Sequence, residues 1–406
     1  MEDLKLFQQA LGLGQPWRVT RSEFDAGRRR LDIHIDFAPG ATFPCPECGR
    51  EGCKAHDTTE KSWRHLNFFQ HEAHLHARTP RVRCSACGVK LVHVPWARPG
   101  SGFTLLFEAL TMMLAKEMPM AALGRIMGEH DTRLWRTVHH YVDEARAEAD
   151  FSQVRHVGVD ETASRRGQVY ISLFVNLEES RLLFATEGRS ASAVAGFRAD
   201  LEAHGGQAEQ VEDFCLDMSA AYIRGIGDSF PDARLTFDKF HIMKTLNDAV
   251  DEVRRDERRA RPELTGSRYV WAKNPENLTR RQFELWQALD VPSLNLKTAR
   301  AYHIRLNFQE FWTASGDHAE AFLKQWYFWA THSRLQPIIE VARMIKRHWD
   351  GVLRWFESQI SNGILEGINS LVQAAKARAR GYRSTRNLIA MAYLLAGKLQ
   401  FRLASI

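Results

Sequence analysis

The sequence has neither a long apolar run nor a leader-like start. No stretch approaches the roughly 18 consecutive apolar residues that suggest a membrane-spanning helix. The first residues, MEDLKLFQQALGLGQPW, begin with acids and lack the basic segment followed by an apolar one that marks a secretory signal. We therefore expect a cytoplasmic protein without a membrane partner.

Charge of either sign is not in large excess. The 406 residues include 55 Lys and Arg against 49 Asp and Glu, a net charge of +6 that permits a polyanionic partner without demonstrating one. A hydrophobic fraction of 44% and a charged fraction of 26% argue against a disordered or fibrous chain. At roughly 150 residues per domain, the length predicts two to four domains.

Cysteine occurs only six times, and its spacing is not that of a disulfide framework. Four cysteines form two Cys-x-x-Cys pairs, Cys45/Cys48 and Cys84/Cys87, each followed by a glycine that suits a tight metal-binding turn. Cys84 follows Cys48 by 36 residues, and each pair lies on an expected hairpin. Together they predict a tetrahedral four-sulfur zinc site, which is closed and therefore structural.

Other uses of the cysteines stay open at this level. The two pairs could be redox dithiols, or a finger that no longer binds metal. Cys53 or His56 lies close enough in the sequence to replace one of the four ligands. The existence of the metal site is thus a firmer prediction than its ligand set.

Residues 103–150 change to a helical period, with three segments: FTLLFEALTMMLAKEM, PMAALGRIMGEHD and TRLWRTVHHYVDEARAEAD. A short middle helix followed by a glycine-containing turn is typical of a helix-turn-helix. The third helix would turn Leu134 and Val138 inward, with Arg133 and Arg136 on its outer side, where they could contact DNA phosphates or bases. The alternatives are an ordinary three-helix bundle and solvated arginines.

Beyond residue 150 the chain becomes strand-rich. The expected order of three strands, helix, strand, helix and strand is that of a ribonuclease-H-like sheet. Two aspartates are expected to end apolar strands, Asp160 after HVGV and Asp217 after DFCL. The first and fourth strands of such a sheet are neighbours. These carboxylates could therefore share two Mg²⁺ or Mn²⁺ ions about 4 Å apart, which would activate an attacking oxygen and stabilise a leaving one.

A third carboxylate is needed from a helix beside the first strand. The candidate is Glu366 in SNGILEGINSLVQAAKARARGYRS, a helix that Ser361 or Asn362 would cap. Glu161 directly follows the first aspartate and therefore faces the other side of its strand. Asp213 lies at the expected beginning of its strand, away from the site.

Residues from about 245 to 355 are predicted to be nearly all helix. Seven of the eleven tryptophans fall between Trp271 and Trp355, which favours an aromatic-rich core over a surface for base stacking. No acid follows Glu366, whereas basic residues cluster there. Those expected to hold a DNA backbone are Lys376, Arg378, Arg380 and Arg383, with Arg386 beside them. A solvated helix face is the alternative.

Taken together, these motifs resemble a known family. CPECG, CSACG, GVDET, CLDMSAAY, FDKFHIMK and SNGILEGIN follow one another as in bacterial insertion-sequence transposases of the DDE class, ISL-three type, over essentially the whole chain. The resemblance implies Asp160, Asp217 and Glu366 as the metal-binding triad, with a helical insertion between the last two. Asp238 and His241 resemble an Asp-x-x-His signature beside the active site of some transposases. His241 could orient a phosphate or leaving group there, or simply cap its helix.

The implied fold is a multidomain α+β and α/β protein. Residues 1–100 would form a zinc-binding β module that binds DNA, 101–150 the helix-turn-helix, and 151–244 with 356–406 a ribonuclease-H-like catalytic domain interrupted by an all-helical insertion at 245–355. The implied activity is recognition of terminal inverted repeats, followed by metal-dependent phosphodiester hydrolysis and strand transfer to target DNA. A dimer or higher oligomer would act on paired ends in the nucleoid. The alternatives are a catalytically silent repressor or domesticated transposase, and a structure-selective nuclease of the same fold.

Overall fold

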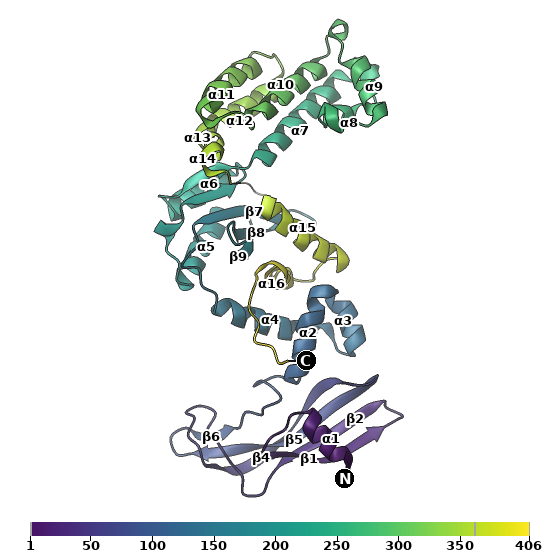
Figure 1. Cartoon of the computed structure of the whole chain (residues 1–406), viewed down its shortest axis with the longest axis vertical. Helices are drawn as coiled ribbons and strands as arrows, with labels where there is room; N and C mark the ends of the chain where they lie inside the picture. Colours follow the sequence, from purple (N-terminus) through teal and green to yellow (C-terminus); the bar gives the residue numbers. More distant parts are fainter. Residues whose placement is uncertain (1, 361–362, 406) are drawn as a thin grey trace. The chain divides into compact units, whose positions relative to one another are not determined.

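The computed structural model describes residues 2–360 and 363–405, so the expected helix caps Ser361 and Asn362 lie outside the described residues. The chain forms two compact units, which are described separately (Figure 1). The first comprises the chain up to Ala147, together with Ala377–Arg380 and the segment from Leu399 onward. The second comprises Glu148–Lys376 and Gly381–Lys398. Within the described ranges, no helix is long and apolar enough to cross a bilayer.

A six-stranded sheet dominates the first unit, with the order β1-β2-β5-β4-β3 and β6 also paired to β5. Its elements are α1 (Glu2–Ala10), β1 (Trp17–Asp25), β2 (Arg30–Phe37), β3 (Thr42–Phe43), β4 (Cys53–Phe68), β5 (His71–Cys84) and β6 (Gly88–Leu91). β1 and β2 pair antiparallel as a hairpin. Alternate residues such as Ile33 and Leu75 are buried in a core with Trp17, Trp63 and Trp96. This core fixes the two turns that carry the paired cysteines.

Three helices complete the first unit and confirm the helical prediction for residues 103–150. They are α2 (Leu105–Glu117), α3 (Met120–Met127) and α4 (Asp131–Ala147). Thr104 caps α2 by accepting a hydrogen bond from the Phe107 amide, and Gly128 ends α3 with a φ of 68°, which favours glycine. In α4, Leu134 and Val138 are fully buried, as expected from the sequence. Arg133 and Arg136 are exposed on the opposite side of α4.

The second unit contains a five-stranded sheet of order β11-β10-β7-β8-β9. Its elements are β7 (His156–Arg165), β8 (Val169–Asn176), β9 (Arg181–Glu187), α5 (Ala191–Ala203), β10 (Asp213–Leu216), α6 (Ala220–Ser229) and β11 (Arg234–Phe237). This is the element order that the sequence predicts. β7 runs parallel to β10 and antiparallel to β8, and β10 runs parallel to β11.

One sequence prediction about this sheet is wrong. Asp160 does not end β7, because the strand continues to Arg165. β10 stops opposite Val159, but β8 pairs with β7 over five further residues. Asp160 therefore lies in the middle of β7. Before it, β7 pairs with both β10 and β8, and from Asp160 onward β7 pairs with β8 alone.

The two faces of this sheet are covered by different helices. On one face, Val159 and Phe174 share a core with Val194 and Phe197 of α5, and the rings of Phe174 and Phe197 stack at 4.6 Å. Helix α15 (Gly363–Arg378) packs against the other face of the sheet, and α16 (Thr385–Ala396) packs against β9. Because side chains alternate along a strand, Asp160 faces α15 and Glu161 faces away from it.

The segment after β11 is helical throughout most of its length, as predicted. Its helices are α7 (Lys239–Glu257), α8 (Arg268–Trp271), α9 (Arg280–Leu289), α10 (Lys297–Phe311), α11 (Gly316–Thr331), α12 (Gln336–Arg347), α13 (Trp349–Leu353) and α14 (Trp355–Ser358). Trp271 and Trp326 are among the largest fully buried side chains, which supports core packing as the main use of the tryptophans. The expected boundary between residues 244 and 245 falls inside α7.

Candidate catalytic and metal-binding sites

The two cysteine turns meet in the first unit. The Sγ atoms of Cys45, Cys48, Cys84 and Cys87 all lie within 4.8 Å of one another, and those of Cys48 and Cys84 are 3.6 Å apart. Four sulfurs at about 2.3 Å from a tetrahedral zinc ion would be separated by about 3.8 Å, so this donor set fits structural zinc. Hydrogen bonds from the Ala86 and Cys87 amides lower the pKa of Cys84 to about 6, which favours the thiolate that zinc binds.

The two alternative ligands lie outside this group. Cys53 is buried, and its Sγ lies 3.5 Å from the carbonyl oxygen of Arg50. The ring of His56 lies 3.4 Å from the guanidinium of Arg83. The group within ligand distance thus consists of the four cysteines from the Cys-x-x-Cys pairs.

Three aspartates form a row across neighbouring parallel strands of the second unit. The strand register aligns Val159, Leu216 and Phe237, and each of these residues is followed by an aspartate. The aspartates are Asp160, Asp217 and Asp238. Because adjacent strands are about 4.8 Å apart, this register brings their carboxyl groups to one edge of the parallel part of the sheet.

The environment of Asp160 disfavours its negative charge. Burial raises its pKa to about 7; a hydrogen bond from the Glu161 amide opposes this shift, and the charges of Asp217, Glu161 and Asp238 add to it. A cation held between Asp160 and the other aspartates of the row would relieve the repulsion. Hard carboxylate oxygens suit a divalent ion such as Mg²⁺ or Mn²⁺.

Helix α15 contacts β7 at regular intervals, with every fourth helix residue meeting every second strand residue. Leu365 packs over Gly158 so closely that a Cβ atom there would lie 2.0 Å from Leu365 Cδ1. One turn further, Asn369 Nδ2 donates to Asp160 Oδ2 at 2.6 Å, and after another turn Gln373 Nε2 donates to Thr162 Oγ1 at 2.7 Å. Four helical residues rise about 6 Å and two strand residues about 6.6 Å, which keeps the two elements matched.

Asn369, rather than Glu366, makes the contact between α15 and Asp160. Glu366 is exposed and precedes Asn369 by three residues, on the adjoining side of the helix. The Oδ1 atom of Asn369 is buried and has no hydrogen-bond partner among the described residues. An unpaired oxygen beside the carboxylates fits a site that takes a cation or an ordered water. The SNGILEGIN motif contains Asn369, but its chemistry alone does not reveal this contact.

Asp238 and His241 open the helix that follows β11. Asp238 is buried and caps α7, accepting a hydrogen bond from the Phe240 amide at 3.2 Å. The capping role that the sequence left open thus falls to Asp238. His241 is half-buried in the first turn of α7, three residues beyond the aspartate row.

The two arginines expected on the outer side of α4 differ in their surroundings. Arg133 forms an ion pair with Glu129, and its guanidinium lies 4.4 Å from the centre of the Phe103 ring. Arg136 is exposed one turn further along. Arg133 therefore connects α4 to the segments before it, whereas Arg136 faces outward.

The C-terminal basic residues are spread over α15, the loop after it and α16. Lys376 Nζ contacts the carbonyl oxygen of Ala163 on β7, and Arg378 Nη1 donates to the carbonyl of Glu117 at 2.9 Å. Arg380 and Arg383 are exposed in the loop between α15 and α16. Lys376 thus serves partly to hold α15 against β7.

A second acidic group lies at the opposite ends of the strands. His156, Glu212 and Asp213 have ligand atoms within 4.8 Å of one another. Asp213 is buried at the start of β10, and its carboxylate already pairs with Arg234 at 3.2 Å and Arg354 at 3.1 Å. Two guanidinium groups neutralise this carboxylate, so we interpret the group as a salt-bridge network joining the sheet to the helical segment.

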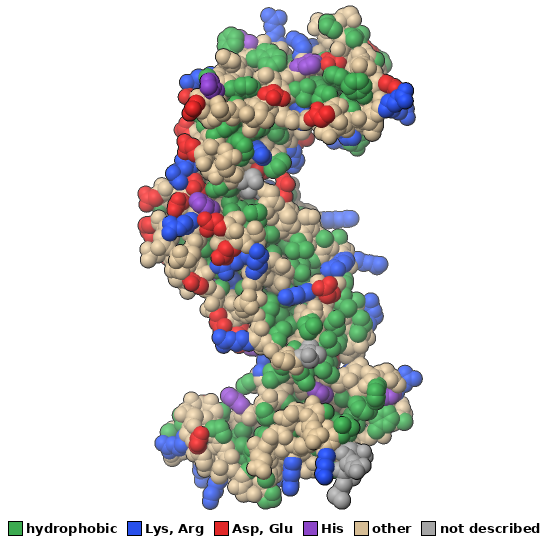
Figure 2. All heavy atoms as spheres, in the orientation of Figure 1, with side chains coloured by type: hydrophobic (Ala, Val, Ile, Leu, Met, Phe, Trp, Pro, Cys, Tyr) green, Lys and Arg blue, Asp and Glu red, His purple; other side chains and the backbone are tan. Residues whose placement is uncertain are grey.

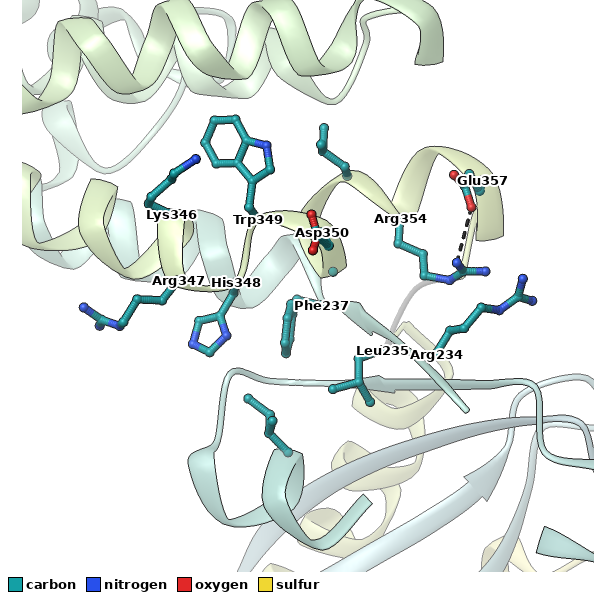
Figure 3. Close-up of a pocket in the computed structure, with 13 residues that line it drawn as sticks. Arg234, Leu235, Phe237, Lys346, Arg347, His348, Trp349, Asp350, Arg354 and Glu357 are labelled. Atoms are coloured by element: carbon teal, nitrogen blue, oxygen red, sulfur yellow. Dashed lines mark ion pairs between the residues drawn. The ribbon is translucent and has the colours of Figure 1, made fainter. Parts of the chain in front are cut away.

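A cavity of 690 Å³ opens beside this network, between β11 and the segment from α12 to α14 (Figure 3). Lys346 lies over the Trp349 ring at 4.3 Å, and the His348 ring is 4.9 Å from that of Phe237. Burial and the charge of Arg347 lower the pKa of His348. The cavity is lined by β11 from Arg234 to Phe237, the residue before Asp238, and by no residue of the aspartate row itself among those described.

Comparison with known proteins places these features in a family. Residues 157–392 match the model of an ISL3 transposase domain, described as "Transposase". Residues 92–142 match the helix-turn-helix domain of transposase family ISL3, and residues 41–87 match the zinc-finger of transposase IS204/IS1001/IS1096/IS1165. The three matches follow one another along the chain and include the cysteine group, the three helices and the aspartate row.

Curated relatives are similar over nearly their whole length. The transposase for insertion sequence element IS1557 of Mycobacterium tuberculosis is 28% identical over 438 aligned residues, covering 98% of this chain and 96% of the relative. The transposase for insertion sequence element IS1001 of Bordetella parapertussis is 29% identical, covering 94% of this chain and 96% of the relative. With a zinc ribbon, a helix-turn-helix and a DDE domain in this order, the chain belongs to the ISL3 family of insertion-sequence transposases.

Proposed function

We propose that this protein catalyses metal-dependent cleavage of DNA at the ends of its own insertion sequence and joins the freed ends to target DNA. The observation that carries the proposal is the row of aspartates formed by Asp160 on β7, Asp217 directly after β10 and Asp238 directly after β11. Carboxylates gathered in this way repel one another unless a cation binds between them.

Asp160 and Asp217 would hold the divalent cations together with Glu366 from α15, in a ribonuclease-H-like catalytic domain. Two Mg²⁺ or Mn²⁺ ions in this site would activate the attacking oxygen and stabilise the leaving oxygen of an in-line displacement. Asn369 fixes the orientation of Asp160 by donating to its Oδ2 atom. His241, in the first turn of α7, would position a phosphate or the leaving group.

The N-terminal part would supply recognition of the terminal inverted repeats. Residues 1–100 with structural zinc and residues 101–150 with the helix-turn-helix form a DNA-reading module in this proposal, with Arg133 and Arg136 on the reading helix. Lys376, Arg378, Arg380 and Arg383 would hold the DNA backbone near the catalytic site. Residues 151–244 and 356–406 form the catalytic domain, with 245–355 as a helical insertion.

Two ends of one element must be cut and joined in concert. One chain offers one row of aspartates, so we propose that a homodimer or a higher oligomer assembles on paired ends. Hydrolysis and strand transfer are both in-line displacements at phosphorus. The same carboxylates can therefore serve both steps in succession.

The test uses a labelled duplex carrying the terminal repeat that flanks the coding sequence, incubated with the full chain and Mg²⁺ or Mn²⁺. Wild-type protein is expected to nick the duplex at the repeat end, and Asp160→Asn, Asp217→Ala and Glu366→Gln are expected to abolish nicking. The matched control is Glu161→Gln, because Glu161 adjoins Asp160 but faces the other side of β7. Tight end binding without nicking by wild-type protein would instead identify a silent repressor. Nicking of any branched duplex, without end preference, would identify a structure-selective nuclease.

A further inference from the structure

Two arginine-rich segments contact each other, one at the C-terminal end of β7 and one that follows the C-terminal end of α15. The end of β7 and the turn after it have the sequence SRRGQ, and the loop before α16 together with the start of that helix has the sequence RGYRSTR. Arg165 Nη2 donates to the carbonyl oxygen of Arg383 at 2.6 Å, across 218 residues of sequence. Below them, Ser164 and Thr385 are both buried, and their hydroxyl oxygens are 3.5 Å apart. The two segments thus hold each other in place.

The joined segments carry charge of one sign only. They bring together three exposed arginines, which we call the arginine platform. Its members are Arg165, Arg166 and Arg383. No acid occurs between Glu161 and Glu178 or anywhere after Glu366, so neither segment supplies a carboxylate to neutralise them. Figure 2 shows Lys and Arg side chains projecting from the side of the second unit on which α15 lies.

Fixing like charges next to one another costs free energy unless an anion compensates. Several exposed arginines of the helical segment pair with a nearby acid, such as Arg280 with Glu284 and Arg259 with Asp256. In the arginine platform, Arg165 instead donates its guanidinium hydrogen bond to the backbone carbonyl of Arg383. This bond holds the arginines of the two segments close together. This arrangement suits a polyanion with regularly spaced charges.

We infer that the arginine platform binds the phosphate backbone of the duplex whose end lies at the aspartate row, an inference that rests on the proposed function. Arg165 follows Asp160 by five residues along β7. At about 3.3 Å per strand residue this spans roughly 16 Å. Duplex DNA advances about 3.4 Å per base pair, so the platform contacts phosphates about five base pairs from the cleaved bond.

Phosphate contacts by the arginine platform lead to two predictions that do not depend on recognition of DNA bases. Replacing two platform arginines weakens binding to the element end and to a scrambled duplex by the same factor. It also reduces the slope of log affinity against log salt by about one for each phosphate contact that is lost. A role in base reading would instead weaken binding to the end alone.

The experiment compares full-length wild-type protein with Arg165→Gln/Arg166→Gln in fluorescence anisotropy titrations from 50 to about 300 mM salt, using a terminal-repeat duplex and a scrambled one. The matched control is Arg255→Gln/Arg259→Gln, in the last turn of α7 and just after it, which removes the same charge from exposed sites at 60% and 83% side-chain exposure. We expect the platform variant to lose one to two units of slope on both duplexes, and the control variant to keep the wild-type slope. Arg165→Lys, which keeps the charge, should recover most of the affinity.

A second measurement locates the contact on the DNA. Neutral methylphosphonates placed about five base pairs from the cleaved bond should weaken wild-type binding and should add nothing to the effect of Arg165→Gln/Arg166→Gln. Equal slopes for wild type and the platform variant, or additive losses, would overturn the inference. If either of these results is found but wild-type protein still cleaves the element ends, only the inference about the arginine platform is refuted. If wild-type protein neither binds nor cleaves ends, the proposed function fails with it.

Discussion

Two arginines of the same helix illustrate how the surroundings of a residue decide its use. Arg133 is held between Glu129 and the Phe103 ring, and its side chain is 43% exposed. Arg136 sits one turn later, exposed, on the same outward side of α4. The hydrophobic pattern of α4 places both residues outside the core, and it cannot distinguish a tethered guanidinium from one that is available to DNA.

We predict that Arg133→Ala and Arg136→Ala separate stability from recognition. Arg133→Ala should lower the free energy of unfolding of the first unit by about 1 kcal/mol, through the lost contact with the ring and the lost ion pair. Arg136→Ala should change stability by less than about 0.5 kcal/mol but weaken binding to the terminal repeat. Urea denaturation and gel-shift titration measure the two effects. Equal stability losses in both variants would contradict this division.

At the scale of elements, the matching of β7 and α15 positions the catalytic candidates. Leu365 occupies the space above Gly158 that any side chain would need, and Asn369 then meets Asp160 one turn later. The position of α15 along the strand is therefore set two residues before the aspartate. A small displacement at Gly158 would be passed along a rigid helix to Asn369 and Glu366.

We predict that Gly158→Ala abolishes end cleavage while leaving binding to the terminal repeat nearly unchanged. The added methyl group would clash with Leu365 and push α15 away from Asp160, whereas the helix-turn-helix belongs to the other unit. Gly158→Ala combined with Leu365→Ala removes the clash with α15, although Leu177 Cδ2 would still lie 2.8 Å from the new Cβ atom, and should restore part of the cleavage. Cleavage assays and gel shifts on the three proteins test this. Cleavage by Gly158→Ala at the wild-type rate would show that the close contact is dispensable.

A second element-scale feature joins the sheet of the first unit to its helices. The ring of His65 on β4 lies 2.9 Å from the hydroxyl of Thr104, the cap of α2. Burial, followed by the charge of Arg64, lowers the pKa of His65 to about 4. The folded state thus keeps the imidazole neutral at a pH where the unfolded chain would protonate it.

We predict that the first unit loses stability as the pH falls from about 6.5 to about 4. In this window the unfolded state binds the proton and the folded state does not, so the contribution of His65 is fully present above pH 6.5 and is lost towards pH 4. The loss from this residue would reach about 3 kcal/mol. His65→Asn should flatten the pH dependence of urea denaturation relative to wild type. Parallel curves for the two proteins would exclude His65 as the cause.

The sequence predicts most elements of the sheet, and its failures have physical reasons. β7 is predicted too short because the apolar run ends at HVGV, while the polar segment beyond it is held by pairing with β8 and by α15. Asp238 joins the aspartate row only through the register of β10 and β11, which sequence spacing does not encode. The contact of Asn369 depends in turn on how far α15 slides along β7.

At the scale of the whole chain, each compact unit contains more than one of the predicted segments. α7 runs across the expected start of the helical segment, and one continuous core contains both Val159 of the sheet and Trp326 of the helical segment. Composition suggested a separate aromatic core there, because tryptophan density is visible in the sequence and shared packing is not. The cysteine group, by contrast, belongs entirely to the first unit, which has a core of its own.

This separation predicts that zinc removal affects one unit and spares the other. Cys45 and Cys84 are proposed zinc ligands and also belong to the core of the first unit, so chelation should uncouple the two cysteine turns from the sheet and lower the first of two unfolding transitions. The second transition, from the sheet that carries Asp160, should not move. Cys84→Ser should reproduce the effect and lose one zinc equivalent per chain, whereas Cys53→Ser should retain the metal, because Cys53 lies outside the four-sulfur group. Calorimetry with zinc analysis decides the matter: a shift of both transitions would show that the units unfold together, and zinc loss in Cys53→Ser would move that cysteine into the ligand set.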